Sequence, residues 1–292
     1  MVVLQGSHKF THSDSEQSFS MRFISRLGMV SLTMVALISA PIVHSSPAFS
    51  QTQTRSTSRS QDLALLFNAA EKALNVPAFQ TDSVTEINGS RSGIAANIQF
   101  RTQTIVQSPN RFRSEVRVGK ETTPRFTIVS DGRTVSIYRS DLKQFTTMSY
   151  SEFDRRNDNF IVGMSSMLYM MLAPSLKEFN SAGGFGNPKL QAQLSTMIPP
   201  EVTSKTEQTN NGNLVVYSYP DRQRGFTYGL AINPIDSLIK QIRLSGNASG
   251  FDLVMTETIQ RRTVNPTIPA TAFRFTPPKD AKRVKSISLS PF

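Results

Sequence analysis

The chain has 292 residues, with 32 lysines and arginines against 21 aspartates and glutamates and a formal net charge of +11. It contains no cysteine and no tryptophan, and its three histidines, His8, His12 and His44, all precede Gln51. The lack of cysteine excludes thiol chemistry, and removal of that N-terminal part on maturation would exclude imidazole chemistry as well.

Residues 1–50 have the pattern of a secretory signal peptide. The basic residues 21–26 precede a mostly apolar run at 27–40, and the small residues Ala48 and Ser50 come just before Gln51. The run is shorter than the roughly 20 residues that cross a bilayer, which disfavours an uncleaved membrane anchor. We therefore expect an exported protein whose mature chain starts at Gln51. The polar residues 1–20 are consistent with a translation start at Met21.

The mature chain lacks the residues that most enzymes use. Without the leader it would have 29 basic and 19 acidic residues, a charge of +10, because Lys9, Arg22, Arg26, Asp14 and Glu16 are removed. No histidine or cysteine remains for a Ser-His-Asp triad, a zinc site or a haem ligand. We therefore expect no enzymatic activity, no cofactor and no metal.

The folded part is expected to begin near Asp62. Residues 51–61 are polar and predict a flexible leader. Asp62 is a suitable N-cap, and apolar residues recur at helical spacing from Leu63 to Leu74, which predicts an amphipathic helix over 62–75. Residues 62–292 are expected to form a single domain.

Most of the remaining chain alternates apolar and polar residues. This period predicts half-buried strands at residues 94–101, 111–118, 126–129, 134–138, 145–148, 213–219, 225–232, 238–244 and 251–259. Asp131-Gly132 between two of them indicates a hairpin turn. Few helices intervene, so the fold class is mainly β (α+β), with an antiparallel sheet.

Residues 158–197 interrupt the strands with a different pattern. An apolar stretch ends at Pro174, a glycine-rich segment follows at 181–187, and a weak helix is expected at 188–197. Two short helices and a loop inserted into a sheet predict a cover for one of its faces.

The basic residues of two neighbouring predicted strands, among them Arg101, Arg111, Arg113 and Arg117, lie on the polar faces of those strands. Nucleic-acid binding would need aromatic and basic side chains on one surface, whereas alternation places them on opposite faces. We therefore expect no nucleic-acid partner. A solvated face and attraction to anionic lipid headgroups both remain open.

The methionines at 164, 167, 170 and 171 fall on one helical face, which is typical of an ordinary core and also of surfaces that accept varied apolar partners. A methionine-lined helix over a sheet with inward phenylalanines could enclose an apolar cavity. The expected lining consists of Phe100, Phe112, Phe126, Tyr138, Met148, Met167, Met170 and Met171.

Three strings resemble landmarks of the periplasmic outer-membrane lipoprotein carriers (LolA-like proteins), in the same order and spacing. They are residues 108–113 (SPNRFR), 128–138 (IVSDGRTVSIY) and 273–279 (FRFTPPK). The chain resembles the uncharacterised exported relatives of those carriers more closely than the carrier itself. One position departs from the pattern, since the carrier has a lid-latching arginine where this chain has Ser108, which leaves Arg111 or Arg113 as substitutes.

The resemblance implies an unclosed antiparallel β-barrel, a half-barrel with short helices covering its concave face. It further implies a monomeric carrier that binds the acyl chains of lipids or lipoproteins and exchanges them with membrane-bound donor and acceptor proteins. The alternative is an envelope regulatory or sensor module that uses the same fold to bind a protein partner.

Overall fold

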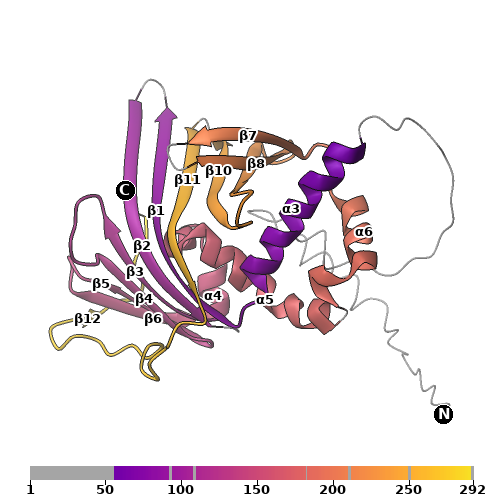
Figure 1. Ribbon diagram of the computed structural model, residues 1–292. Helices are drawn as coiled ribbons and strands as arrows, with labels where there is room; N and C mark the ends of the chain where they lie inside the picture. The colour runs from indigo at the N-terminus through magenta and orange to yellow at the C-terminus, as the bar shows by residue number, and fades with distance from the viewer. Residues whose placement is uncertain are drawn as a thin grey trace, which may run out of the picture.

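The computed structural model describes residues 56–91, 94–107, 110–181, 183–209, 212–248 and 251–290, so the expected signal peptide and mature start lie outside the described residues. The described part forms a 12-stranded sheet in the order β12-β6-β5-β4-β3-β2-β1-β11-β10-β9-β8-β7 (Figure 1). Neighbouring strands are antiparallel except β12 and β6, which are parallel. Because β12 and β7 are edge strands that do not pair with each other, the sheet is an open half-barrel, as predicted.

The strands, in chain order, are β1 (Ala78–Arg91), β2 (Ile94–Gln107), β3 (Arg111–Val118), β4 (Phe126–Asp131), β5 (Thr134–Arg139), β6 (Gln144–Ser149), β7 (Thr203–Thr209), β8 (Gly212–Asp221), β9 (Phe226–Ile232), β10 (Ile239–Ala248), β11 (Phe251–Val264) and β12 (Lys282–Arg283). All nine strands predicted from alternation are present, some of them longer than expected. The sequence did not indicate β1, β7 or β12.

The helices are α3 (Ser56–Leu74), α4 (Tyr150–Asp154), η2 (Asn159–Val162), α5 (Met164–Ser181), η3 (Gly184–Gly186) and α6 (Pro188–Met197). Two predictions were wrong at their ends. Helix α3 begins at Ser56 rather than at Asp62, since adding a residue to an existing helix costs little. Helix α5 continues through Pro174, because Leu172 and Leu176 are buried on either side of it and outweigh the lost hydrogen bond.

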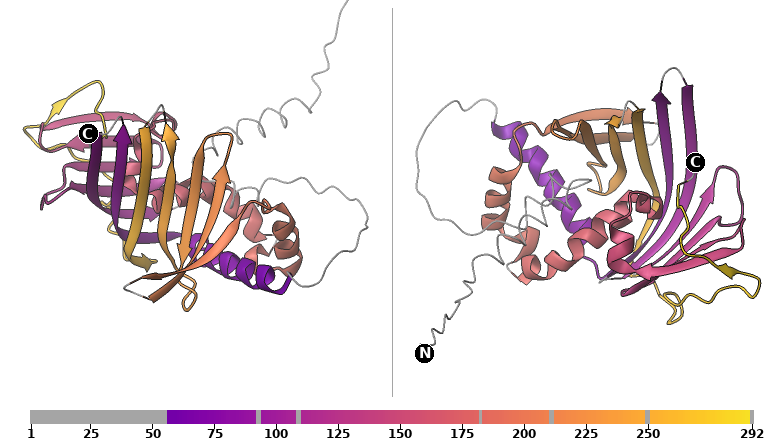
Figure 2. Two further views of the ribbon diagram at one scale, coloured as in Figure 1. Left: turned by 90° about the horizontal axis from the view of Figure 1, so that it is seen from above. Right: turned by 180° about the vertical axis from the view of Figure 1, so that it is seen from behind.

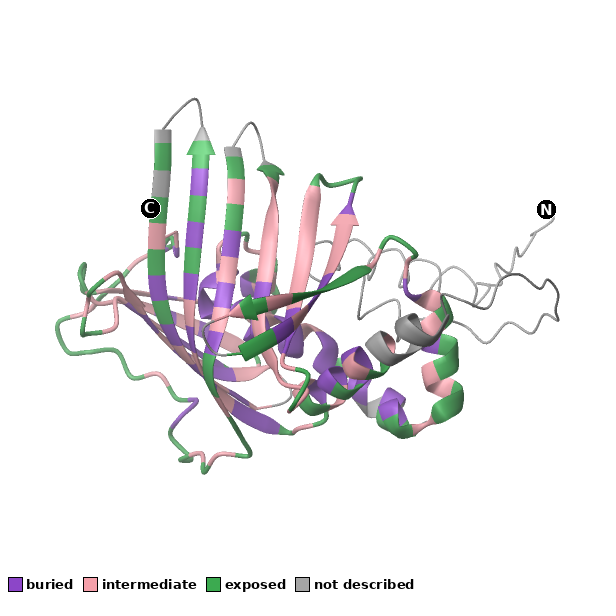
Figure 3. Cartoon of the chain, turned by 45° about the horizontal axis from the view of Figure 1, so that its top comes forward, coloured by how far each residue is buried: buried purple, intermediate pink, exposed green. Residues whose placement is uncertain are grey.

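The helices gather on the concave side of the curved sheet, as the two views of Figure 2 show. Strand β3 illustrates why, since Phe112, Ser114 and Val116 are buried and alternate with half-buried arginines and Glu115. Period-two alternation gives the sheet one apolar face, which the helices cover. Figure 3 shows this burial concentrated where the helices meet the sheet.

Hydroxyl groups on the concave face attach the helical insertion to the sheet. Thr102 Oγ1 donates to the Ile161 carbonyl at 3.2 Å, and Thr104 Oγ1 donates to the Val162 carbonyl at 2.8 Å. Both carbonyls belong to η2, which leads directly into α5. The start of α5 is therefore held at a defined place over β2.

The C-terminal segment covers the β6 edge of the sheet. After β12, Ile287 and Leu289 enter the core with exposures of 5% and 0%. Arg156 donates to the Ile287 carbonyl at 2.9 Å, and the Leu289 amide donates to Asp158 Oδ2 at 2.8 Å. This segment therefore shields an edge that could otherwise pair with another chain.

Candidate functional site

An apolar cavity of about 260 Å³ lies between the helices and the β8–β11 part of the concave face. Its lining is Leu66, Asn157, Phe160, Met164, Leu168, Tyr217, Ser218, Tyr219, Phe226, Tyr228, Gly229, Leu230, Ile242, Arg243, Leu244, Leu253 and Met255. Most of these side chains are hydrocarbon or aromatic. The cavity suits an apolar ligand, since such sites combine an apolar wall with few polar groups.

The sheet wall of the cavity is built from cross-strand rows of side chains. Tyr228 on β9 pairs with Leu244 on β10, and Leu244 pairs with Met255 on β11. A neighbouring row joins Tyr217, Leu230 and Ile242. Residues opposite each other on adjacent strands point to the same face, so the two rows form a continuous apolar surface.

The helical wall comes from three elements. Leu66 belongs to α3, Phe160 to η2, and Met164 and Leu168 to the first turns of α5. Leu66 is 1% exposed, whereas Leu230 and Leu244 on the sheet wall are only half-buried. The cavity is therefore bounded by well-buried helical residues on one side and by less fully covered strands on the other. Most residues of β9 and β10 have the intermediate colour in Figure 3.

The polar residues of the lining are Asn157, Ser218, Arg243 and three tyrosines, and the surroundings of two of the tyrosines keep their hydroxyls neutral. Burial raises the pKa of Tyr228, and the nearby Asp221 carboxylate raises it further. Burial also raises the pKa of Tyr219, again with a contribution from Asp221. A neutral phenol adds a hydrogen-bonding group without placing a charge beside a hydrocarbon ligand.

None of the eight side chains expected to line a cavity is among the residues that line this one. Phe100, Phe112 and Phe126 are 0% exposed and belong to the packed core. The ring of Phe112 lies 5.5 Å from Phe153 of α4, and that of Phe100 lies 6.4 Å from Phe160 of η2. The helices thus fill the half of the concave face on which these phenylalanines lie.

Tyr138 lies on the opposite face of the sheet from the one expected. Val135 and Ile137 of β5 are buried, whereas Tyr138 is half-buried and its ring lies 6.4 Å from that of Phe275, which lies between β11 and β12. An aromatic residue can pack on either face of a strand when another segment covers the outer face, as Phe275 does here.

The four methionines that were expected to line a cavity differ in how far they are buried. Met148 and Met170 are buried at 9% and 3% exposure, and Met167 and Met171 pack half-buried against the core. Of the methionine stripe on α5, only Met164 lines the cavity. Strands β8–β10 were predicted, but nothing in their alternation marked the part of the concave face that the helices leave open.

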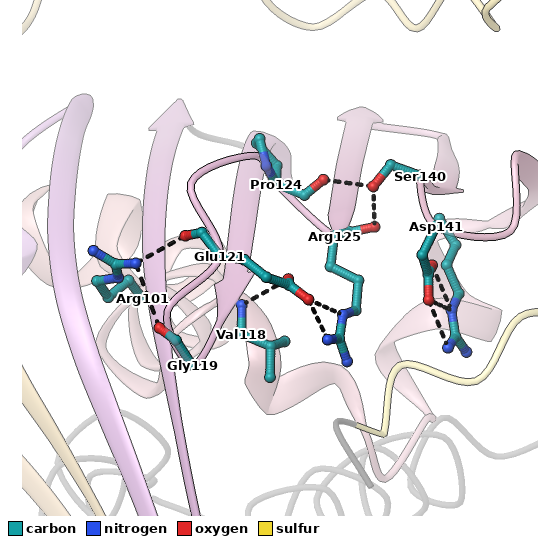
Figure 4. Close-up of polar contacts among 9 residues, drawn as sticks. Arg101, Val118, Gly119, Glu121, Pro124, Arg125, Ser140 and Asp141 are labelled. Atoms are coloured by element: carbon teal, nitrogen blue, oxygen red, sulfur yellow. Dashed lines mark hydrogen bonds and ion pairs between the residues drawn. The ribbon is translucent and has the colours of Figure 1, made fainter.

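The basic side chains of β2 and β3 face the convex side, where Arg101 and Arg117 donate hydrogen bonds to other residues of the same chain. Arg101 donates to the Glu121 carbonyl at 2.8 Å and to the Gly119 carbonyl at 3.4 Å, while the Glu121 carboxylate accepts from Arg125 (Figure 4). Arg117 donates to the Thr122 carbonyl at 3.0 Å. These contacts order the β3–β4 loop, as expected of a solvated structural face.

Neither expected substitute for the lid-latching arginine reaches the helices. Arg113 forms an ion pair with Glu115 at 3.2 Å, and the guanidinium of Arg111 lies 4.7 Å from the ring centre of Phe273. Ser108 lies outside the described residues. The hydrogen bonds that attach the helical insertion to the sheet include those of Thr102, Thr104 and Glu257.

Within the described ranges, no cluster of three or more acidic or histidine side chains is arranged to hold a metal ion. None of the described helices is long and apolar enough to cross a membrane.

Comparison of the structure with solved structures finds similar folds at low identity. A conserved uncharacterised protein from Thermus thermophilus is 12% identical with a TM-score of 0.40, covering 77% of this chain and 98% of that one. A LolA superfamily protein from Nitrosomonas europaea is 12% identical with a TM-score of 0.31, covering 73% and 96%. A putative outer membrane lipoprotein-sorting protein domain from Vibrio parahaemolyticus is 5% identical with a TM-score of 0.33, covering 74% and 97%.

No family model and no curated protein matches the sequence. One of the structures above is named as a LolA superfamily protein and another as a putative lipoprotein-sorting domain. At TM-scores of 0.40 or less, these likenesses assign no activity to the chain.

Proposed function

We propose that this chain is a periplasmic binding or carrier protein that holds the acyl chain of a lipid or lipoprotein in the cavity between α5 and strands β8–β11. The observation that carries the proposal is the apolar cavity itself, with Met164 and Leu168 on one wall and Tyr228, Leu244 and Met255 on the other. Burial of apolar area would supply the binding free energy, at about 0.8 kcal/mol per methylene.

The size of the cavity supports a chain rather than a compact cargo. An engineered apolar cavity of about 150 Å³ accommodates benzene, so 260 Å³ holds a longer section of hydrocarbon. Uptake of a longer chain would need the wall to yield, and Met164 suits such a wall because methionine is flexible and polarisable. Release would follow from movement of α5 away from the sheet.

A single polar substitution in the sheet wall tests this function. Leu244→Asn places an amide among the apolar side chains of the cavity, where an unpaired polar group costs about 1–3 kcal/mol when a ligand excludes water. We expect uptake of a fluorescent fatty acid to weaken about 5- to 140-fold, since 1.4 kcal/mol corresponds to a factor of ten. The measurement is a fluorescence titration of the purified protein.

Val254→Asn is the matched control. Val254 lies on β11, is 46% exposed and faces away from the cavity, whereas Leu253 beside it lines the cavity. We expect this variant to bind like the wild type. Equal binding by Leu244→Asn and the wild type, together with absence of lipid from protein purified from its native periplasm, would contradict the proposal and favour a module that binds a protein partner.

A further inference from the structure

A second cavity lies beside the first, at the end of the half-barrel where α3 finishes. It has a volume of about 70 Å³ and is bounded by α3, α5 and strands β10 and β11. Leu168 and Ile242 line both cavities, so these two side chains stand between them. One end of a ligand in the apolar cavity would therefore be separated from the second cavity by a single layer of side chains.

The second cavity differs from the first in its charge. Lys72, Lys240, Arg261 and Arg262 all line it. Two carboxylates are close: Asp236 Oδ2 lies 3.3 Å from Lys240 Nζ, and Asp82 Oδ2 lies 2.6 Å from Arg261. Lys72 Nζ donates to the Asp236 backbone carbonyl at 2.7 Å, which does not cancel its charge. The cavity thus has more cations than anions around it.

Arg262 is the least compensated of these cations. Its guanidinium lies 3.9 Å from the ring centre of Phe79, and it donates one hydrogen bond, at 2.6 Å, to the Ala73 carbonyl at the end of α3. Its Nε is buried without a hydrogen-bond partner, and among the described residues no carboxylate lies within ion-pair distance of it. A buried charge without a counter-ion is costly, and an anion in the cavity would reduce that cost.

Arg262 keeps its charge where it lies. Burial lowers the pKa of Arg262 to about 10, which leaves the guanidinium protonated at neutral pH. Glu257 is the next acidic group toward the core, but burial raises its pKa, which weakens it as a counter-charge.

We propose that the second cavity, with Lys72, Lys240 and Arg262, binds the anionic headgroup, a carboxylate or phosphate, of a lipid whose acyl chain occupies the apolar cavity. The proposal rests on the function proposed above and adds the class of ligand. The volume suffices, since a water molecule needs roughly 10–15 Å³ of such space and the cavity offers about 70 Å³. Movement of Leu168 at the shared wall would join the two cavities.

The test compares dodecanoic acid and dodecyl phosphate with dodecanol, each competing with a fluorescent apolar probe. We expect wild-type protein to bind both acids at least about tenfold more tightly than the alcohol, because hydrogen bonds to charged groups are worth about 1.5–3 kcal/mol. In the double variant Lys72→Gln, Lys240→Gln this preference should fall about tenfold while binding of the alcohol stays the same. Arg262 is left in place because its contacts with Ala73 and Phe79 support the fold.

The control is Lys189→Gln, Lys205→Gln, which removes the same charge from exposed positions on α6 and β7. It should retain the preference for acids. Equal binding of the acid and the alcohol by wild type would overturn the headgroup site and leave the acyl-chain function standing. Failure to bind any of the three would overturn both. Inorganic phosphate bound as tightly as dodecyl phosphate would show a free-anion site and overturn the assignment to a lipid.

Discussion

Glu257 on β11 has no exposed surface, and its carboxyl group accepts hydrogen bonds from the first turn of α5. Its Oε2 accepts from the Ser165 amide at 2.7 Å, and its Oε1 accepts from the Ser165 hydroxyl at 2.9 Å. Amide groups at a helix start lack partners within the helix, and a negative charge there is favoured by the helix dipole. Glu257 thus caps α5 from a strand that lies far away in the sequence.

The protonation of Glu257 should make the stability of the protein depend on pH. Burial is the largest influence and raises the pKa of Glu257 above its usual 4.5, against the opposing hydrogen bonds from Ser165, Ser83 and Met164. A carboxyl group whose pKa is higher in the folded than in the unfolded protein loses stabilising effect as pH rises through the folded pKa. Below its unfolded pKa, that contribution is fully present.

Glu257→Gln isolates this effect, since glutamine resembles the protonated form and does not titrate. We expect the wild type to lose free energy of unfolding relative to Glu257→Gln as the pH rises above the ordinary pKa of a glutamate, because the folded-state pKa is the higher one. Urea denaturation at each pH measures the difference. Hydrogen bonds lower the pKa values of Asp131 and Asp158, so these residues lose stabilising effect as the pH falls. Both residues are present in both proteins, so their effect cancels in the difference. A difference that is independent of pH would contradict the expectation.

At the scale of the element, the junction between η2 and α5 depends on Gly163. Its φ is +96°, and a Cβ atom there would lie 2.9 Å from Oε1 of Glu257. Gly119 has a φ of +58° but open space around it. The two glycines therefore share a backbone requirement, and only Gly163 adds a steric one.

We expect Gly163→Ala to reduce the free energy of unfolding by about 3 kcal/mol, from backbone strain of roughly 1–3 kcal/mol together with displacement of the Glu257 cap. Gly119→Ala should cost only about 1–2 kcal/mol, because strain acts alone there. Urea denaturation gives both values, and hydrogen exchange should show the extra loss concentrated in α5. Equal losses would mean that the Glu257 contact does not hold the helix.

Elements also show how far the sequence could predict this fold. Strand β3 was predicted with its observed bounds because Phe112, Val116 and their polar neighbours alternate clearly. Strand β1 was missed because several of its buried positions are Thr81, Ser83 and Thr85, which carry no apolar signal. These residues are buried because α5 covers them, and Thr81 Oγ1 lies 3.4 Å from Ser166 Oγ of that helix.

The candidate site was harder to predict than the strands. Alternation identifies the apolar face of a strand but does not show which stretch of that face a helix covers. Phe100 and Leu244 both face the helices, yet Phe100 is sealed at 0% exposure while Leu244 lines the cavity. The difference comes from where α4, η2 and α5 lie, which depends on contacts between residues far apart in the chain.

At the scale of the whole molecule, an open sheet has one face that can be filled or left partly empty. Strands β2–β6 are filled by α4, η2 and the C-terminal segment, while β8–β11 retain the cavity. The filled half contributes stability, and in the function proposed above the open half would bind the ligand, with α5 as its movable wall. The packing of α5 would therefore affect both the free energy of unfolding and the size of the ligand that the cavity admits.

Affinity for acyl chains should accordingly rise with length and then level off. Each methylene that fits the cavity adds about 0.8 kcal/mol, or about a fourfold increase in affinity. Chains too long for 260 Å³ must displace α5 from Glu257, and that cost offsets further burial. A titration series of saturated fatty acids measures the length at which the increase stops.

Loosening the junction of α5 should move that limit to longer chains. Gly163→Ala weakens the closed position of the helix, so less binding free energy is spent on opening it. We expect this variant to bind short chains like the wild type and long chains more tightly, whereas Gly119→Ala follows the wild type at every length. An identical limit in all three proteins would show that α5 does not move on binding, and the cavity would then be a rigid site for short apolar ligands.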